Sequence, residues 1–170
     1  MNILARRLRS IPIGRAVFID ANVFHFYLRG PEDIRKECTK FLERVEKEEI
    51  LGYTSVLVLD ELMYKILLRT IEEKHEKNPL VIIEHDFEAI GRNSSYVKGA
   101  IELVLGINGL NVLDVTKEDL HNSPDLMESF SLLPRDAVHL SVMLDHGISD
   151  IASSDKDFDR VRDLIRWAPI

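Results

Sequence analysis

The chain has 170 residues, of which 45% are hydrophobic and 30% are charged, a composition typical of a globular protein. Its length predicts one domain over residues 1–170, large enough to bury a core without disulfides or a structural metal. The lone cysteine, Cys38, excludes a disulfide within the chain, argues against a cysteine zinc site and fits a reducing cytoplasm. The formal net charge of −7 argues against nucleic-acid binding by bulk positive charge.

The first fifteen residues are basic and carry Arg6, Arg7, Arg9 and Arg15. They lack the apolar stretch of a secretory signal, and no run in the chain reaches the ~18 apolar residues of a membrane helix. We therefore expect a cytoplasmic protein that does not contact a membrane. The segment 1–15 is predicted to be an N-terminal arm or short helix, which either contacts phosphates or packs as a solvated tail.

The first predicted strand is Ala16 to Asp20 (AVFID), a short apolar run that ends in a carboxylate. A helix is predicted from Pro31 to Val45, because apolar residues recur there at helical spacing. Residues 50–54 (ILGYT) predict a second strand. Residues 55–69 are apolar nearly all round and therefore predict a buried helix.

The middle of the chain begins with a predicted polar break at residues 71–80. A helix or helix pair is expected over 81–106, interrupted near Gly91–Ser95. Asn111 to Val115 (NVLDV) predicts a third strand, and residues 117–130 are expected to be partly helical.

The last predicted helix begins at Pro134 and ends near His146, with Gly147 as the residue that terminates it. Residues 148–153 and 164–168 predict a fourth and a fifth strand. Short strands that alternate with helices indicate an α/β fold, in which a parallel sheet of four or five strands is covered by helices on both faces. In such sheets the functional site lies at the carboxyl ends of the strands.

Carboxylates stand at several of these positions. Asp20 closes the first strand, where it could equally cap the next helix, and Asn22 could orient it through a hydrogen bond. Glu61 lies in the apolar helix, and burying its charge without a partner would be costly. Asp60 points about 100° away round that helix, so periodicity does not decide which of the two faces the site. The structural alternative for Glu61 is a salt bridge within the helix.

Two further acidic positions lie in the last third of the chain. Asp136 is in the first turn of a helix, where the helix dipole alone would favour it, and His139 shares its face. A lone histidine is more often structural than functional. Asp155 follows the fourth strand, with Asp157 and Asp159 close behind, and the alternative is a turn of solvated acids. The spacing lacks the glycine and glutamate of an EF-hand, which argues against that calcium motif.

A parallel sheet can bring these acids together at one edge. Hard oxygen ligands select Mg²⁺ or Mn²⁺, and two such ions about 4 Å apart suit phosphodiester hydrolysis. Without metal, we expect burial and neighbouring acids to raise the pKa of Glu61.

At these positions the sequence resembles the PIN-domain ribonucleases, and its layout is similar to the VapC-type toxins. FIDANVF resembles the opening strand of the family and carries Asp20. TSVLVLDEL resembles the second motif, which points to Glu61 rather than Asp60. PRDAVHLSVML resembles the third motif and carries Asp136, and IASSDKDFD resembles the fourth, with Ser153, Asp155 and the accessory Asp157.

The resemblance covers residue 16 to the C-terminus, whereas segments 1–15 and 71–105 exceed a minimal toxin of this type. It implies a Rossmann-like three-layer PIN fold and a Mg²⁺- or Mn²⁺-dependent endoribonuclease. Asp20, Glu61, Asp136 and Asp155 would be its catalytic residues, with Asp20, Asp136 and Asp155 as metal ligands. Glu61 would bind the metal directly or through water, or would orient the nucleophile, and Asp157 would be an accessory ligand. It also implies an RNA substrate, a homodimer and, for a toxin, a neutralising antitoxin.

Other classes of function fit the sequence less well. The absence of GxxxxGK[ST] excludes a P-loop NTPase. A haloacid-dehalogenase-like phosphatase also has an aspartate after its first strand, but its second acid would stand where this chain has Asn22. A PIN-like module that binds RNA or scaffolds a complex without catalysis is the main alternative, and the intact set of acids argues against it.

Overall fold

The computed structural model describes residues 6–169, which form an α/β fold around a parallel sheet. The sheet has six strands in the order β1-β6-β5-β2-β3-β4, and every neighbouring pair is parallel. The strands are β1 (Arg6–Arg7), β2 (Ala16–Ile19), β3 (Leu51–Ser55), β4 (Leu110–Leu113), β5 (Asp150–Ala152) and β6 (Ile165–Ala168). The predicted fold class is confirmed.

The sheet has one strand more than the four or five predicted, because β1 is too short to leave a hydrophobic pattern. Its two exposed arginines pair with Trp167 and Ala168 of β6. Residues 1–5 of the predicted arm lie outside the described residues. The remainder is this strand followed by the 3₁₀-helix η1 (Leu8–Ser10), in which Leu8 is buried.

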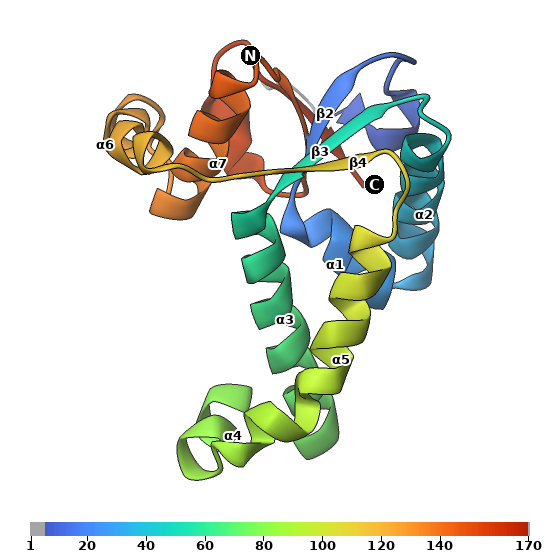
Figure 1. Ribbon diagram of the computed structural model, residues 1–170, viewed down its shortest axis with the longest axis vertical. Coiled ribbons are helices and arrows are strands. Elements are labelled where there is room, and N and C mark those ends of the chain that lie inside the picture. Colours follow the sequence, from blue (N-terminus) through green and yellow to red (C-terminus); the bar gives the residue numbers. More distant parts are fainter. Residues whose placement is uncertain (1–5, 170) are drawn as a thin grey trace.

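The described part of the chain also has seven α-helices, together with a second 3₁₀-helix, η2 (Lys156–Arg160). The α-helices are α1 (Ala21–Arg29), α2 (Glu32–Glu46), α3 (Val56–His75), α4 (Pro79–His85), α5 (Glu88–Leu105), α6 (Lys117–Phe130) and α7 (Pro134–Asp145). Figure 1 shows α3 and α5 running side by side away from the sheet, with α4 at their far end. Helices α6 and α7 lie at the opposite end of the molecule, which contains the sheet. None of the helices in residues 6–169 combines the length and apolar character needed to cross a membrane.

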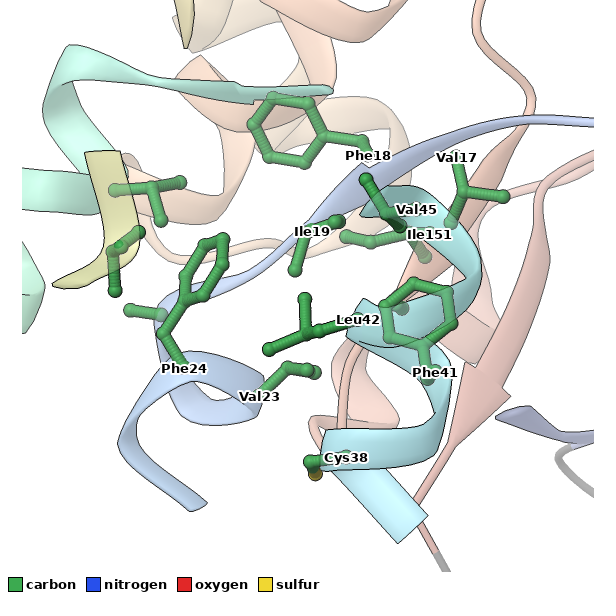
Figure 2. Close-up of a cluster of buried hydrophobic side chains, with 14 of the residues drawn as sticks. Val17, Phe18, Ile19, Val23, Phe24, Cys38, Phe41, Leu42, Val45 and Ile151 are labelled. Atoms are coloured by element: carbon green, nitrogen blue, oxygen red, sulfur yellow. The ribbon is translucent and has the colours of Figure 1, made fainter. Parts of the chain in front are cut away.

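The two faces of the sheet are covered by different helices. Successive side chains of a strand point to opposite faces, so Phe18 faces away from Val17 and Ile19. The Phe18 ring lies 5.8 Å from the His139 ring of α7, measured between centroids. Figure 2 shows the other apolar layer, in which the side chains of α1 and α2 pack beneath β2. The three-layer arrangement therefore follows from β2, whose apolar side chains point to both faces of the sheet.

The helical region between β3 and β4 differs from the prediction at two points. Helix α3 continues to His75, into the first half of the expected polar break, because its last turns pack along α5, and the break itself is confined to residues 76–78. The expected interruption at Gly91–Ser95 is also wrong. Within α5, the buried Asn93 side chain donates to the Ala89 carbonyl at 2.7 Å and accepts from Lys74 of α3 at 2.7 Å. The chain breaks instead at Asp86, whose backbone leaves the helical conformation with φ −149° and ψ 78°.

The order of the strands fixes where the site lies. β2 lies at the middle of the sheet, between β5 and β3, and runs parallel to both. The backbone N–H of Asp20 continues the pairing by donating to the Ala152 carbonyl at 3.1 Å. The residues that follow β2 and β5 therefore meet at one edge of the sheet. Helices α3 and α7 begin near this edge, after β3 and the α6–α7 connection, respectively.

Candidate active site

Asp20 follows β2 directly and is the N-cap residue of α1. It is 6% exposed. Its Oδ1 accepts a hydrogen bond from the Ala21 backbone N–H at 2.6 Å, and its Oδ2 accepts from the Ser153 hydroxyl at 2.6 Å and from the Asn22 amide. Burial raises the pKa of Asp20, and the hydrogen bond from Ser153 opposes that rise. The residue is a helix cap whose second oxygen belongs to a buried polar network.

Ser153 is the centre of that network. Its buried Oγ donates to Asp20, accepts from the Asn22 amide at 3.0 Å, and accepts from the Asp155 backbone N–H at 2.9 Å. The amide oxygen of Asn22 in turn accepts from the Ser154 backbone N–H at 3.0 Å. One hydroxyl group thus joins the segment after β2 to the segment after β5. Asn22 makes the hydrogen bond to Asp20 that was expected to orient this carboxylate.

Glu61 lies one turn into α3 and turns toward α7, whereas Asp60 is exposed. Its side chain is 15% exposed. Oε1 lies 2.8 Å from the Lys65 ammonium, and Oε2 lies 3.6 Å from the Arg135 guanidinium and 3.8 Å from His139 Nε2. The predicted salt bridge within the helix and the placement toward the other acids therefore both occur.

The expected rise in the pKa of Glu61 is wrong. The neighbouring His139 ring lowers the pKa most, burial opposes it, and Lys65 lowers it further, so that the pKa of Glu61 is about 2. The sequence could not reveal that the pKa of Glu61 is lowered, because His139 lies in a different helix, α7. The carboxyl groups whose pKa burial does raise are those of Asp20 and Asp136.

His139 is buried in α7 with its ring between β2 and Glu61. Within residues 6–169 neither ring nitrogen has a hydrogen-bond partner, and the 3.8 Å to Glu61 exceeds hydrogen-bond length. Buried polar atoms are normally satisfied, so this ring has unused donor capacity at the acidic cluster. Its spacing of three residues from Asp136 was the signal for this placement in the sequence.

Asp136 lies in the first turn of α7, as predicted. Burial is the main cause that raises its pKa to about 6, and the nearby charges of Asp155, Asp20 and Glu61 add to the rise. The carboxyl groups of four separate segments are therefore close enough to repel one another. His139, one helical turn further along, acts in the opposite direction.

The fourth acidic segment is the short helix η2 and its cap. Asp155 Oδ1 accepts from the Asp157 backbone N–H at 2.8 Å, and Asp157 accepts from the Arg160 guanidinium at 2.8 Å. Arg160 also donates to the carbonyls of Phe130, the last residue of α6, and of Ser131, the first residue after it. The acidic turn is thereby fastened to the segment that leads to Asp136.

The candidate ligand atoms fall into two groups, and within each group they lie within 4.8 Å of one another. The groups are Asp20, Glu61 and His139, and Asp136, Asp155 and Asp157. A pocket of about 640 Å³ brings the groups together, because Glu61, Asp136 and Asp155 all line it. All five predicted acids thus belong to two adjoining groups, and Asp60 belongs to neither.

The donor set fits a divalent cation. Its members are mostly carboxylate oxygens, the ligands that Mg²⁺ and Mn²⁺ prefer. The mutual repulsion that raises the pKa of Asp136 is what a bound cation would relieve. Each of the two groups could offer three ligand atoms to such an ion: Asp20, Glu61 and His139 in one, and Asp136, Asp155 and Asp157 in the other, where Asp157 is also paired with Arg160.

Three basic residues of the site were missed in the sequence as functional candidates. Lys65 and Arg135 flank Glu61, and Arg160 holds Asp157. The spacing of four residues between Glu61 and Lys65 identified that pair as a salt bridge only. Nothing in the linear pattern indicated that Arg135, beside Asp136, would contact an acid of α3.

Comparison with known proteins gives several related chains. Ribonuclease VapC2 of Methanocaldococcus jannaschii is 26% identical over 148 residues, which cover 85% of this chain and 88% of the relative. Among solved structures, VapBC2 from Rickettsia felis, bound to a DNA fragment from its promoter, matches with a TM-score of 0.58 at 16% identity, over 90% of this chain and 98% of that one. A toxin–antitoxin complex from Klebsiella pneumoniae matches with a TM-score of 0.53 at 15% identity, over 91% and 98%.

These structural matches establish likeness of fold. The sequence profile of the PIN domain accounts for residues 17–164, from β2 to the residue before β6, and this range includes all five acids of the site. The chain therefore belongs to the PIN-domain family, and it is similar in sequence to VapC ribonucleases.

Proposed function

We propose that this protein is a metal-dependent endoribonuclease that hydrolyses phosphodiester bonds of RNA. The observation that carries the proposal is the convergence of Glu61, Asp136 and Asp155 on one pocket, with Asp20 joined to the same segment through Ser153. Membership of the PIN-domain family and similarity to a named ribonuclease support the same activity. The family match also leaves the phosphatase alternative without support.

In this proposal Asp20, Glu61, Asp136 and Asp155 hold Mg²⁺ or Mn²⁺, and Asp157 is an accessory ligand. A bound ion would polarise the phosphodiester and lower the pKa of attacking water. Ser153 and the Ala21 N–H fix both oxygens of Asp20, so that carboxylate is positioned before any ion arrives. His139 and Lys65 keep Glu61 ionised, because they lower its pKa.

We also propose that the chain acts as the toxin of a toxin–antitoxin pair in the cytoplasm. Its partners would be an antitoxin protein and a second copy of the chain. The supporting observations are the similarity to Ribonuclease VapC2 and the fold shared with a toxin–antitoxin complex. Co-expression with the protein encoded beside it, followed by light scattering of the purified sample, would test both assemblies.

The nuclease itself is tested by incubating purified protein with a mixed pool of structured and single-stranded RNA in Mn²⁺. The comparison set is Asp20→Asn, Asp136→Asn and an EDTA control. Asp145→Asn is the matched control, because Asp145 is an exposed acid at the other end of α7. We expect cleavage by the unaltered protein and Asp145→Asn, and a loss of at least about 100-fold in the site variants.

Metal binding gives a second measurement that does not depend on finding the right RNA. At a free Mn²⁺ concentration a hundredfold above its Kd, the free energy of unfolding should rise by about 2.7 kcal/mol. Asp20→Asn and Asp136→Asn should reduce this gain, and Asp145→Asn should keep it. A non-catalytic module would show no cleavage and no stabilisation that depends on the carboxylates.

A further inference from the structure

A second cavity, of about 310 Å³, lies between the 3₁₀-helix η1 and helix α2, and we refer to it as the α2 cavity. The charged side chains that line it are Arg9 of η1 and Asp33, Lys36, Glu37, Lys40 and Arg44 of α2. Most of the α2 residues stand three or four positions apart, so they lie on one side of the helix. None of the described residues lines both this cavity and the pocket of Glu61, Asp136 and Asp155.

Cations outnumber acids in the α2 cavity, although the formal net charge of the chain is −7. Lys36 is paired with Glu32, which lies outside the cavity, at 2.6 Å. Arg9 and Lys40 belong to none of the ion pairs that join residues 6–169, and both are exposed. An anion in the cavity would therefore meet two cations that are not already paired with an acid.

The guanidinium of Arg44 is held in place by the segments that follow η1 and α2. Its Nη2 donates to the Ile11 carbonyl at 2.7 Å, and its Nε donates to Glu49 at 3.1 Å. The remaining nitrogen, Nη1, is buried and has no hydrogen-bond partner within the described part of the chain. Because the other two nitrogens fix the plane of the group, the unused donors of Nη1 have a defined position.

Glu37 has an unsatisfied acceptor on the same side of α2. Its Oε1 is buried, and no group among residues 6–169 donates to it. Glu37 and Arg44 both line the cavity, and their seven-residue spacing places them two turns apart. Between them lies Phe41, which is 1% exposed and belongs to the core (Figure 2). A ligand toward which both side chains turned would satisfy a donor and an acceptor that are otherwise costly to bury.

The volume of the α2 cavity and its cationic groups indicate the class of ligand. The volume is at the lower end of the roughly 300–1,000 Å³ of small-molecule sites, so a small ligand fits better than a strand or a peptide. Arg9, Lys40 and Arg44 offer three cationic groups. A phosphate monoester has three terminal oxygens and about two negative charges, whereas an RNA backbone phosphate is a diester with a single charge. The cations therefore match a monoester better.

From these observations we propose that the α2 cavity binds a small phosphate monoester that also carries hydroxyl groups, such as a sugar phosphate or a nucleoside monophosphate. Arg9, Lys40 and Arg44 hold the phosphate, and Asp33 and Glu37 accept hydrogen bonds from the hydroxyl groups. The site goes beyond the proposed ribonuclease function, since it needs no metal and shares none of its residues with the acidic pocket.

The test is calorimetric titration of the full chain in EDTA, which keeps the acidic pocket free of metal. The ligands are ribose 5-phosphate, 5′-AMP, ribose, inorganic phosphate and a short RNA with a 5′-hydroxyl end. The double variant Arg9→Ala with Lys40→Ala removes two cations of the cavity. Its matched control, Arg35→Ala with Lys47→Ala, removes two exposed cations that do not line the cavity. Arg44 is left intact because it also holds Ile11.

We expect at least one of the two esters to bind. The Arg9 and Lys40 double variant should raise its Kd by about 100-fold, because each hydrogen bond between charged groups is worth about tenfold or more. The control variant removes the same charge and should change the Kd by less than about threefold. Inorganic phosphate should bind at least about tenfold more weakly than the ester, since it offers no hydroxyl groups to Asp33 and Glu37. Ribose, which has no phosphate, should not bind. Urea unfolding should show the same stability for both double variants.

Three outcomes would overturn the proposal. If neither ester binds at millimolar concentration, the cavity is not a phosphate monoester site. Equal weakening in the two double variants would show attraction to the overall charge and no specific site. Displacement of a bound ester by the RNA would assign the cations to a nucleic-acid backbone. Each outcome is separate from RNA cleavage in Mn²⁺, because neither double variant alters the acidic pocket.

Discussion

At the scale of single residues, the site depends on one hydroxyl group as much as on its acids. Ser153 joins Asp20 to the backbone of Asp155, so it sets the distance between two acidic segments. The sequence offered Ser153 only as the residue in a family position, and its three hydrogen bonds became visible when β2 and β5 were brought together. Positioning residues of this kind lack a charge that a sequence pattern can single out.

Ser153→Ala should therefore weaken metal binding. Asp20 would lose the hydrogen bond that lowers its pKa, and an outer partner of a metal ligand is typically worth about 10–100-fold in affinity. Removing a partner from a buried network should also cost about 1–3 kcal/mol in the free energy of unfolding. Mn²⁺ titration by calorimetry and urea unfolding measure the two effects.

The neighbouring Ser154 supplies the control, since it is exposed and only its backbone N–H reaches the network. Ser154→Ala should bind Mn²⁺ as the unaltered protein does. Ser153→Thr should retain most of the affinity, because it keeps the hydroxyl. Equal affinities for Ser153→Ala and Ser154→Ala would show that the hydroxyl does not position Asp20.

Asp136 predicts a pH dependence with a definite sign. Its pKa in the folded, metal-free protein is raised from 3.8 to about 6, chiefly by burial. The folded state therefore holds this proton more tightly than the unfolded chain, and the resulting stabilisation is full below pH 3.8 and lost as the pH rises through about 6. A metal ion competes for the same oxygen atoms, so Mn²⁺ affinity should fall as the pH drops below about 6.

Calorimetric titration with Mn²⁺ on both sides of the pKa of Asp136 checks this expectation. Glu61 does not interfere, because its pKa of about 2 keeps it ionised throughout that range. Asp136→Asn, which cannot titrate, should lose the part of the pH dependence that Asp136 causes. An affinity that stays constant from pH 7 to pH 5 in the unaltered protein would contradict the assignment of Asp136 as a ligand.

At the scale of helices and strands, the sequence was most informative where a single element carries the pattern. The apolar strand before Asp20, the helix that begins at Pro134 and the glycine that follows it, Gly147 with a φ of +65°, all lie where they were predicted. The predictions failed where contact with another element decides whether a segment forms a helix or a strand. Strand β1 is held in the sheet by its pairing with β6. Helix α5 continues through Gly91 because it packs on α3.

Two glycines, one packed against another element and one facing open space, test the effect of such contacts on stability. A methyl group at Gly52 of β3 would lie 2.5 Å from Val45 Cγ1 of α2, so Gly52→Ala should destabilise by about 1–3 kcal/mol. A methyl group at Gly91 of α5 meets nothing within 4 Å among the described residues, so Gly91→Ala should stabilise by up to about 1 kcal/mol through helix propensity.

Urea unfolding of the two variants gives both values. The double variant Gly52→Ala with Val45→Ala should recover part of the loss, because the clashing methyl group is gone. If Gly91→Ala were as destabilising as Gly52→Ala, the continuous helix over Glu88–Leu105 would be contradicted, and the predicted interruption near Gly91 would regain support.

At the scale of the whole molecule, the acidic balance of the chain remains the feature that a nucleic-acid function must accommodate. The net charge is −7, and the cations at the site are few: Lys65, Arg135 and Arg160 are each already close to a carboxylate. In the proposed ribonuclease, RNA would thus be held by the metal centre rather than by a broad basic face. Its binding should differ measurably from that of a basic protein.

We therefore expect a weak salt dependence. A protein that neutralises 6–10 phosphates loses about 10³–10⁵ in affinity between 50 and 200 mM salt, whereas one or two contacts should cost about tenfold or less. KM measured over this range of KCl, at a constant free Mn²⁺ concentration, tests the expectation. A loss of a thousandfold would reveal a basic surface that the site described here does not include.

The separation of the site's parts along the chain has a consequence for biosynthesis. Asp20 and Ser153 are 133 positions apart, and β5, which pairs with one side of β2, is translated after β2, β3 and β4. While β5 is still inside the ribosome, the nascent chain has only the β3 side of β2 to pair with, and Asp20 has no hydroxyl partner. The Asp20–Ser153 network therefore forms only after β5 has emerged, so the nascent chain cannot assemble the candidate site while its earlier strands and helices are being made.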